Sequence, residues 1–230
     1  MLENLISKVD SVFYECSGSD PDPVVIALAS GGMDSCVMLK YLSMKSRNVI
    51  VLTINPRSRS SMEVAALRKI VSVIGLSRLL VFNIPELYEL IELKDLGIAI
   101  RNRDMFYIPG RNAIFLSIGI YVAEVYGAKV LFTAHNSEDV RFFPDASIDF
   151  MDSMTKVASY YIGEKDFRIC PLFKNLSKNE VAALGKLINA PLEYSWSCYM
   201  GYSYQCGRCR GCVDRSKSLK FADKLILKNS

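Results

Sequence analysis

The choice of folds is narrowed first by an unbroken apolar run that passes directly into a glycine-containing turn. Residues 24–29 read Val-Val-Ile-Ala-Leu-Ala, and a helical pattern follows at 37–44. An apolar run without polar alternation is typical of a strand that is buried on both faces, as in a parallel sheet covered by helices. The sequence therefore predicts a strand–turn–helix unit near the start of the chain.

Strands and helices alternate along the rest of the chain. The pattern predicts strands at 49–54, 79–84 and 130–134, and helices at 63–74, 112–126, 148–161 and 178–188. Ser177 and Glu180 have the spacing of a capping box at the start of the last helix. This alternation predicts an α/β fold with a doubly wound, mostly parallel sheet, whose ligands bind beyond the carboxyl ends of the strands.

We expect three parts in the chain. They are an N-terminal helical extension at 1–22, the α/β domain at 23–194, and a cysteine-rich knuckle with a C-terminal helix at 195–230. No segment reaches the roughly 18 apolar residues of a membrane span, and the N-terminus lacks the apolar core of a secretory signal. We therefore expect a cytoplasmic protein without a membrane partner.

The net charge of +4 is mild and unevenly spread. Between residues 208 and 228 the basic residues outnumber the two acids, Asp214 and Asp223. A basic tail of this kind suits a contact with nucleic acid or nucleotide phosphate, and it equally suits a solvated helix face.

The turn after the first strand has the composition of a phosphate-binding loop. Consecutive glycines let the backbone approach an anion without interference from Cβ, and N–H groups at the helix start then face that anion. Asp34 would repel phosphate directly, so we expect it to bind magnesium or to cap the helix. The pattern is neither a Walker A loop nor a dinucleotide-binding loop, and an ordinary capped turn is the alternative. The predicted cofactor-binding residues are Ala29, Ser30, Gly31, Gly32, Met33, Asp34 and Ser35.

Four cysteines near the C-terminus have the spacing of a metal site. They are Cys198, Cys206, Cys209 and Cys212, arranged as C-x7-C-x2-C-x2-C. Four sulfurs close a tetrahedral site with no open position, so we expect structural zinc, with an iron–sulfur cluster as the alternative. Cys16, Cys36 and Cys170 lack partners at ligand spacing. Cys36 follows the loop and suits a small core residue better than a nucleophile.

The loop resembles the signature of the N-type ATP pyrophosphatases, the PP-loop enzymes, which cleave ATP to AMP and pyrophosphate. Loop and cysteines together resemble the QueC family, the 7-cyano-7-deazaguanine synthases of queuosine biosynthesis, over residues 24–222. Further matching segments are Tyr-Ile-Pro-Gly-Arg-Asn at 107–112, Asn-Ser-Glu-Asp at 136–139, Phe-Pro-Asp at 143–145 and Ser-Trp-Ser-Cys-Tyr at 195–199. The resemblance implies a Rossmann-like fold of the adenine nucleotide alpha hydrolase-like kind.

The resemblance also implies a reaction. QueC enzymes take 7-carboxy-7-deazaguanine, ammonia and ATP to the nitrile. The carboxylate is adenylated, ammonia displaces AMP to give an amide, and a second activation dehydrates the amide. Magnesium and preorganised donors would offset charge on the α-phosphate. We therefore expect an ATP-dependent ligase that forms C–N bonds and uses ATP, magnesium and structural zinc, and the family implies a homodimer.

Polar residues in the matched segments are candidates for substrate contacts. Arg111 suits a clamp on carboxylate or phosphate, and Asn112 can read a base edge. Asp139 and Asp145 suit the N–H groups of a guanine-like ring, and Lys178 suits a phosphate. The alternatives are a structural ion pair for Arg111, a helix cap for Asn112, turn formation for the two aspartates and solvent exposure for Lys178. The predicted catalytic residues are Asp34, Arg111, Asp139 and Asp145.

The chain departs from the family pattern where the substrate and nucleophile should be handled. The usual Asp-Tyr-Gly-Gln-Arg-His after the second strand is Asn-Pro-Arg-Ser-Arg-Ser at 55–60, so Arg59 is retained, as is Glu63 beyond it. Ala146 stands where the family has cysteine. His135, the single histidine, suits either a proton shuttle or a satisfied polar residue at a strand end. The nucleophile is therefore ammonia or a protein amine, the latter as in QueC-like proteins of bacterial defence systems.

Two other classes of function share parts of this pattern. Enzymes that thiolate or amidate tRNA use the same loop, but they usually add a tRNA-binding domain or a catalytic cysteine pair, for which this chain has no room. A non-enzymatic nucleic-acid module would need only the cysteine knuckle and the basic tail, and it would bind RNA or DNA in a salt-sensitive way. The glycine loop has no purpose in that alternative, so we expect no nucleic-acid partner.

Overall fold

A computed structural model describes residues 2–56, 62–87, 89, 108–163, 165–200 and 202–228. The departures at residues 57–60, including Arg59, and the matched Tyr107 lie outside these ranges. Five parallel strands form one sheet in the order β3-β2-β1-β4-β5. Their bounds are β1 Val25–Leu28, β2 Val49–Asn55, β3 Arg78–Asn83, β4 Val130–Asn136 and β5 Arg168–Phe173.

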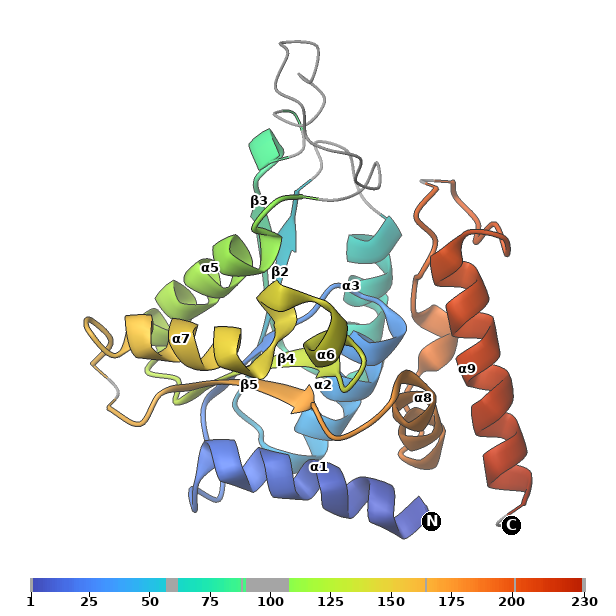
Figure 1. Ribbon diagram of the computed structural model, residues 1–230, viewed down its shortest axis with the longest axis horizontal. Helices are drawn as coiled ribbons and strands as arrows, with labels where there is room; N and C mark the ends of the chain where they lie inside the picture. Colours follow the sequence, from blue (N-terminus) through green and yellow to red (C-terminus); the bar gives the residue numbers. More distant parts are fainter. Residues whose placement is uncertain are drawn as a thin grey trace.

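Helices cover both faces of the sheet (Figure 1). Those that pack against one face are α1 Leu2–Ser17, α2 Met33–Lys45, α3 Met62–Ile74 and α8 Lys178–Leu187, with α9 Arg210–Leu227 outside α8. Those on the other face are α5 Arg111–Tyr126 and α7 Ile148–Ala158. Short helical turns complete the fold at α6 Asp139–Phe142, η2 Pro144–Ala146 and η3 Leu192–Tyr194. The predicted α/β doubly wound architecture is thereby confirmed.

The central strand β1 shows why an unbroken apolar run was needed. Val25 and Ala27 pack into the core on the side of α2, while Ile26 packs into the core on the side of α5. All three side chains are fully buried, since successive residues of a strand point to opposite faces and both faces are covered here. Strand β1 pairs with β2 on one edge and with β4 on the other, which places it between the two halves of the fold.

The N-terminal helix belongs to the main core. Leu5, Val9 and Phe13 are buried at helical spacing, and the ring of Phe13 stacks on Phe132 of β4 with centroids 5.6 Å apart. A disulfide joins Cys16 at the end of α1 to Cys170 of β5. The sequence alone does not pair these two cysteines, because 154 residues separate them and only the fold brings them together.

Strand β5 was not predicted. Its sequence contains Pro171, which is a poor residue for a central strand because it has no N–H to donate. The sheet order places β5 at an edge, where one side of the strand makes no ladder and proline is tolerated. The capping box before α8 is confirmed, since the Ser177 N–H donates to Glu180 Oε2 at 2.8 Å and Ser177 Oγ accepts from the Glu180 N–H at 3.3 Å.

Within the described ranges, every helix is too short or too polar to cross a membrane.

Candidate active site

A cavity of about 350 Å³ opens at the carboxyl ends of β1, β2 and β4. It is lined by the loop after β1, the first residues of α3, α5 and α8, and the segment that contains Trp196 and Tyr199. Ligands of doubly wound sheets bind at this edge, beside the strand where the order of the sheet reverses. Here that reversal falls at β1 and β4, and the predicted phosphate loop lies directly there.

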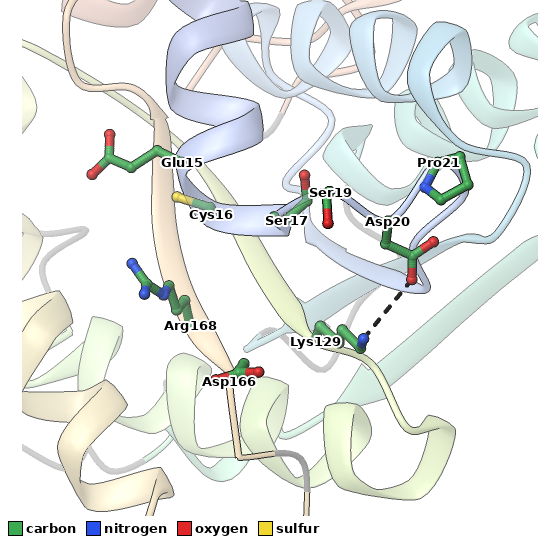
Figure 2. Close-up of a pocket in the computed structure, with 10 residues that line it drawn as sticks. Glu15, Cys16, Ser17, Ser19, Asp20, Pro21, Lys129, Asp166 and Arg168 are labelled. Atoms are coloured by element: carbon green, nitrogen blue, oxygen red, sulfur yellow. Dashed lines mark ion pairs between the residues drawn. The ribbon is translucent and has the colours of Figure 1, made fainter.

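A second cavity of about 460 Å³ lies at the amino ends of β4 and β5, opposite the carboxyl ends where the first cavity opens (Figure 2). It is formed by the end of α1 and by Lys129 and Arg168, which stand at the amino ends of β4 and β5. Lys129 pairs with Asp20 across it, with 3.9 Å between Nζ and Oδ2. It is the larger of the two, but the smaller cavity gathers most of the predicted nucleotide- and substrate-binding residues and is the candidate active site.

The phosphate loop is held in place by its first glycine. Gly31 has a φ of +88°, and a Cβ built on it would lie only 2.2 Å from the carbonyl oxygen of Glu63 at the start of α3. The carbonyl of Gly31 accepts a hydrogen bond from the main-chain N–H of Trp196 at 2.9 Å. From the sequence, both glycines of the loop are explained by the close approach of an anion to the backbone. At Gly31 the structure gives another cause, which is the close packing of the loop against α3.

The loop places the first turn of α2 at the cavity. The first N–H groups of any helix have no intrahelical acceptor. Gly32 is the N-cap of α2, and no side-chain cap at this position accepts a hydrogen bond from those N–H groups. Ser35 Oγ accepts from the Ser30 N–H at 3.0 Å, and Ser30 Oγ accepts from the Gly32 N–H at 3.3 Å. Of the predicted loop residues, Ala29, Ser30, Gly32, Met33, Asp34 and Ser35 line the cavity. A helix N-terminus of this kind attracts anions.

Asp34 is the most unusual group in the cavity. Its Oδ1 is buried without a hydrogen-bond partner in the described part of the chain, while its Oδ2 accepts from Asn136 Nδ2 at 3.3 Å. Burial raises the pKa of Asp34 to about 6, although the nearby charge of Lys178 acts in the opposite direction. A buried carboxylate with a free coordinating oxygen fits a divalent cation.

The turn between β4 and α6 is organised by Asn136. Asn136 Oδ1 accepts from the N–H groups of Glu138 at 2.9 Å and of Asp139 at 3.2 Å, and the Asn136 N–H donates to Asp139 Oδ2 at 3.2 Å. Asp139 therefore forms the turn with one oxygen, as the alternative interpretation proposed. It does not line the cavity, although its charge acts on both Asp34 and His135.

Lys178 lines the cavity at the start of α8. Burial lowers its pKa, but the carboxylates of Asp34 and Asp139 outweigh burial, and the pKa ends above its usual value. The ammonium group is therefore charged at neutral pH. This cation and the N-terminus of α2 make the centre of the cavity favourable for a triphosphate or an acyl phosphate.

Arg111 and Asn112 line the cavity from the start of α5. Asn112 Nδ2 donates to the main-chain oxygen of Asp145 at 3.0 Å, which ties α5 to η2 and leaves Asn112 Oδ1 as the acceptor. The side chain of Arg111 is exposed and lies near enough to His135 to lower its pKa. Asp145 is not among the lining residues, although its carboxylate also acts on His135. The substrate roles of these residues stay predictions.

Several lining residues were not predicted from the sequence. Trp196, Tyr199 and Arg215 come from the segment around the cysteines and from α9, and Thr53 and Glu63 come from the far side of the loop. Trp196 and Tyr199 were quoted only as part of the matched segment at 195–199. No sequence pattern indicated a site role for Arg215, because a cation on a basic helix is expected to be exposed to solvent. Its Nη2 instead donates to the oxygen of Leu192 at 2.8 Å, at the edge of the cavity.

The four cysteines of the predicted metal site come together. The sulfurs of Cys198, Cys206, Cys209 and Cys212 lie within 4.8 Å of one another, which is compatible with a shared metal ion. Gly211 lies among them, and a Cβ there would meet the oxygen of Ser197 at 2.1 Å. The knuckle also reaches the active site, since Gly211 lines the cavity and Trp196 Nε1 donates to Cys198 O at 3.0 Å.

Cys36 does not reach the cavity. Its side chain is fully buried in the core between α2 and the sheet, and burial raises the pKa of its thiol to about 12. A thiol held protonated in an apolar core is not a nucleophile, which agrees with the favoured interpretation as a small core residue.

Comparison with known proteins identifies the family to which the chain belongs. The model of the family described as queuosine biosynthesis protein QueC matches residues 24–223. The 7-cyano-7-deazaguanine synthase of Methanobrevibacter smithii is 30% identical over 216 residues, which cover 86% of this chain and 93% of the relative. The synthase of Thermoplasma volcanium is 31% identical over 222 residues, covering 87% and 89%.

A solved structure shares the fold. The NH3-dependent NAD synthetase from Campylobacter jejuni superposes with a TM-score of 0.59 at 14% identity, covering 100% of this chain and 88% of that one. The likeness agrees with the Rossmann-like α/β fold of this chain. Taken with the family match over most of the chain, these findings establish that the chain belongs to the QueC family.

Proposed function

We propose that this chain is a 7-cyano-7-deazaguanine synthase, which uses ATP to convert 7-carboxy-7-deazaguanine and ammonia into the nitrile. The observation that carries the proposal is the cavity at the carboxyl end of β1. A glycine loop, a helix N-terminus and an unpartnered carboxylate oxygen meet there, in a chain of the QueC family. Each of these features suits a nucleotide triphosphate with its cation.

ATP is proposed to lie with its phosphates against the first turn of α2. Ser30 and the N–H groups after Gly32 are the donors available to it. Asp34 would hold magnesium, because its Oδ1 is a buried oxygen that is still without a partner. When bound, magnesium would neutralise charge on the triphosphate.

The acid substrate is proposed to enter from the side of β4 and α5. Arg111 lines the cavity on that side and Lys178 lines it at the start of α8, and these two cations suit the substrate carboxylate and the α-phosphate. Asn112 Oδ1 would accept an N–H of the heterocycle, since Nδ2 is already engaged with Asp145. A carboxylate oxygen then attacks the α-phosphorus and pyrophosphate leaves, which turns a poor electrophile into one with a good leaving group.

Amide formation follows from the same geometry. The nitrogen of ammonia attacks the acyl carbon and AMP leaves, so the enzyme is proposed to be a ligase that forms a C–N bond. A second activation with ATP would remove the amide oxygen and give the nitrile. The names of the relatives favour this product over a conjugate with a protein acceptor. A homodimer, expected from the resemblance, is retained as part of the proposal.

The four cysteines are proposed to hold structural zinc. Four thiolates give zinc a closed tetrahedral shell without a position for substrate. The knuckle would then act on catalysis through position alone, because it carries Trp196 and Gly211 at the wall of the cavity.

The experiment is pyrophosphate release in the first turnover from ATP and magnesium, with two matched heterocycles and no ammonium. One is 7-carboxy-7-deazaguanine, and the control is 7-deazaguanine, which lacks the carboxylate. Pyrophosphate should form only with the acid, and Asp34→Ala should abolish it. Equal pyrophosphate release with both heterocycles, or none with either, would contradict the proposed activation.

A further inference from the structure

His135 lies near the end of β4 and lines the active-site cavity. Its Nδ1 is 2.9 Å from Oγ1 of Thr133, a residue that is only 1% exposed, so the ring is held by its own strand. Nothing in the described part of the chain bonds to Nε2. The ring therefore has one nitrogen committed to the protein and one left for a molecule in the cavity, as in many histidines that transfer protons.

Charged groups surround this ring on three neighbouring elements. They are Asp139 on α6, Asp145 on η2 and Arg111 on α5. Burial lowers the pKa of His135 below its usual value, the two carboxylates oppose burial, and Arg111 acts with it. The ring is therefore neutral at physiological pH, which is the form that can accept a proton.

Other bases in the cavity are poorly suited to the acyl group. Lys178 has a raised pKa and is protonated at neutral pH. Asp34 lies at the phosphate loop, where the proposed function gives it a cation. Glu63 stands on α3, at the opposite side of the loop from β4. Of the groups that line the cavity on the side of β4 and α5, His135 is the neutral base.

We propose that Nε2 of His135 is the base for the amine step, the attack of ammonia on the activated carboxylate. This inference rests on the proposed function. The nitrogen lone pair forms the new C–N bond, and the bond from the acyl carbon to the AMP oxygen breaks with its electron pair on AMP. One proton passes from the nitrogen to Nε2, and the imidazolium formed returns that proton to solvent. His135 is thus a catalytic residue for amide formation and has no part in adenylation.

The test measures the two half-reactions separately in wild type and His135→Gln. Glutamine keeps a neutral hydrogen-bonding side chain but cannot take a proton. Adenylation, followed as pyrophosphate released in the first turnover without ammonium, should stay within about twofold. Amide formation from ammonia should fall by about a hundredfold or more, the usual contribution of a general base. Hydroxylamine, a stronger nucleophile and weaker base, should react at nearly the wild-type rate.

The outcomes separate this inference from the proposed function. If wild type forms no adenylate from the acid substrate, the proposed function fails. If adenylate forms and His135→Gln makes amide from ammonia at the wild-type rate, only the role of His135 fails. An equal loss of adenylation, ammonia transfer and hydroxylamine transfer would also overturn it, since that pattern belongs to a structural residue.

A second measurement needs no variant. Because His135 is the single histidine, the 15N imidazole signals of labelled protein report this ring alone. Its titration should give a pKa below the usual value, and the acid limb of the transfer rate, expressed per concentration of unprotonated ammonia, should fall at the same pH. An acid limb at a clearly different pH, while the ring titrates elsewhere, would overturn the assignment.

Discussion

Replacing Gly31 by alanine should destabilise the whole fold. The φ of +88° is strained for any residue with a Cβ, and the new methyl group would lie 2.2 Å from the Glu63 carbonyl oxygen and 3.1 Å from the Leu67 nitrogen. The backbone strain costs about 1–2 kcal/mol, and overpacking against a helix backbone costs roughly 1–3 kcal/mol. We expect Gly31→Ala to lower the free energy of unfolding by about 2–5 kcal/mol, which is roughly 4–20 °C in Tm for a chain of this size.

Gly32→Ala is the matched control. Gly32 has a φ of −71° and a ψ of 173°, which any residue adopts, and its nearest neighbour would be Ser30 Oγ at 3.4 Å. Its stability should stay within about 1 kcal/mol of wild type. Gly32 does line the cavity, so the added methyl group should weaken the binding of ATP while the fold persists.

Thermal unfolding by circular dichroism and calorimetric titration with ATP and magnesium separate the two effects. Gly31→Ala should lose mainly stability, and Gly32→Ala should lose mainly affinity. Two variants with the same Tm would refute the argument that packing on α3 requires Gly31. A Gly32→Ala protein as unstable as Gly31→Ala would refute the argument that only one of the two glycines is conformationally required.

Three further predictions follow from the site. Because burial raises the pKa of Asp34 to about 6, ionised Asp34 opposes folding above that pH and the penalty disappears below about pH 4, its unfolded value. Asp34→Asn should therefore raise the free energy of unfolding of the ligand-free protein near pH 8 by at most about 3 kcal/mol, seen as a higher Tm, and should match wild type near pH 4. Cys209→Ser should lower metal content, measured by mass spectrometry of the element, together with Tm; a metal-free variant of full stability would contradict a structural metal. Trp196→Phe removes the bond from Nε1 to Cys198 O, worth about 1 kcal/mol, but keeps the main-chain bond to Gly31. Trp196 is the single tryptophan, so ATP should quench or shift the fluorescence of wild type, and a silent wild-type signal on saturation would contradict its place at the cavity.

Much of the fold was predictable because local pattern and tertiary burial agree. The run at 24–29 is apolar on both sides of the strand, and β1 is covered on both sides. The capping box at Ser177 is a local interaction that three residues determine. Strand β5 was missed because Pro171 argues against a strand, and only the order of the sheet shows that the strand lies at an edge.

The part of the site that a single continuous segment forms was predictable from the sequence. Asp34 and the loop residues reach the cavity because a strand end and a helix start fix their direction. Long-range contacts were not predictable. The closeness of Gly31 to Glu63, the burial of Arg215 against Leu192 and the disulfide between Cys16 and Cys170 all depend on packing between distant segments.

The proposed function requires this cavity to convert the carboxylate of 7-carboxy-7-deazaguanine into a nitrile. Purified protein with ATP, magnesium, this acid and 15N-labelled ammonium should give a product whose mass equals the nitrile with one labelled nitrogen, with AMP formed alongside. Recovery of unchanged acid with no AMP, under conditions where the protein is folded and carries its metal, would contradict the account.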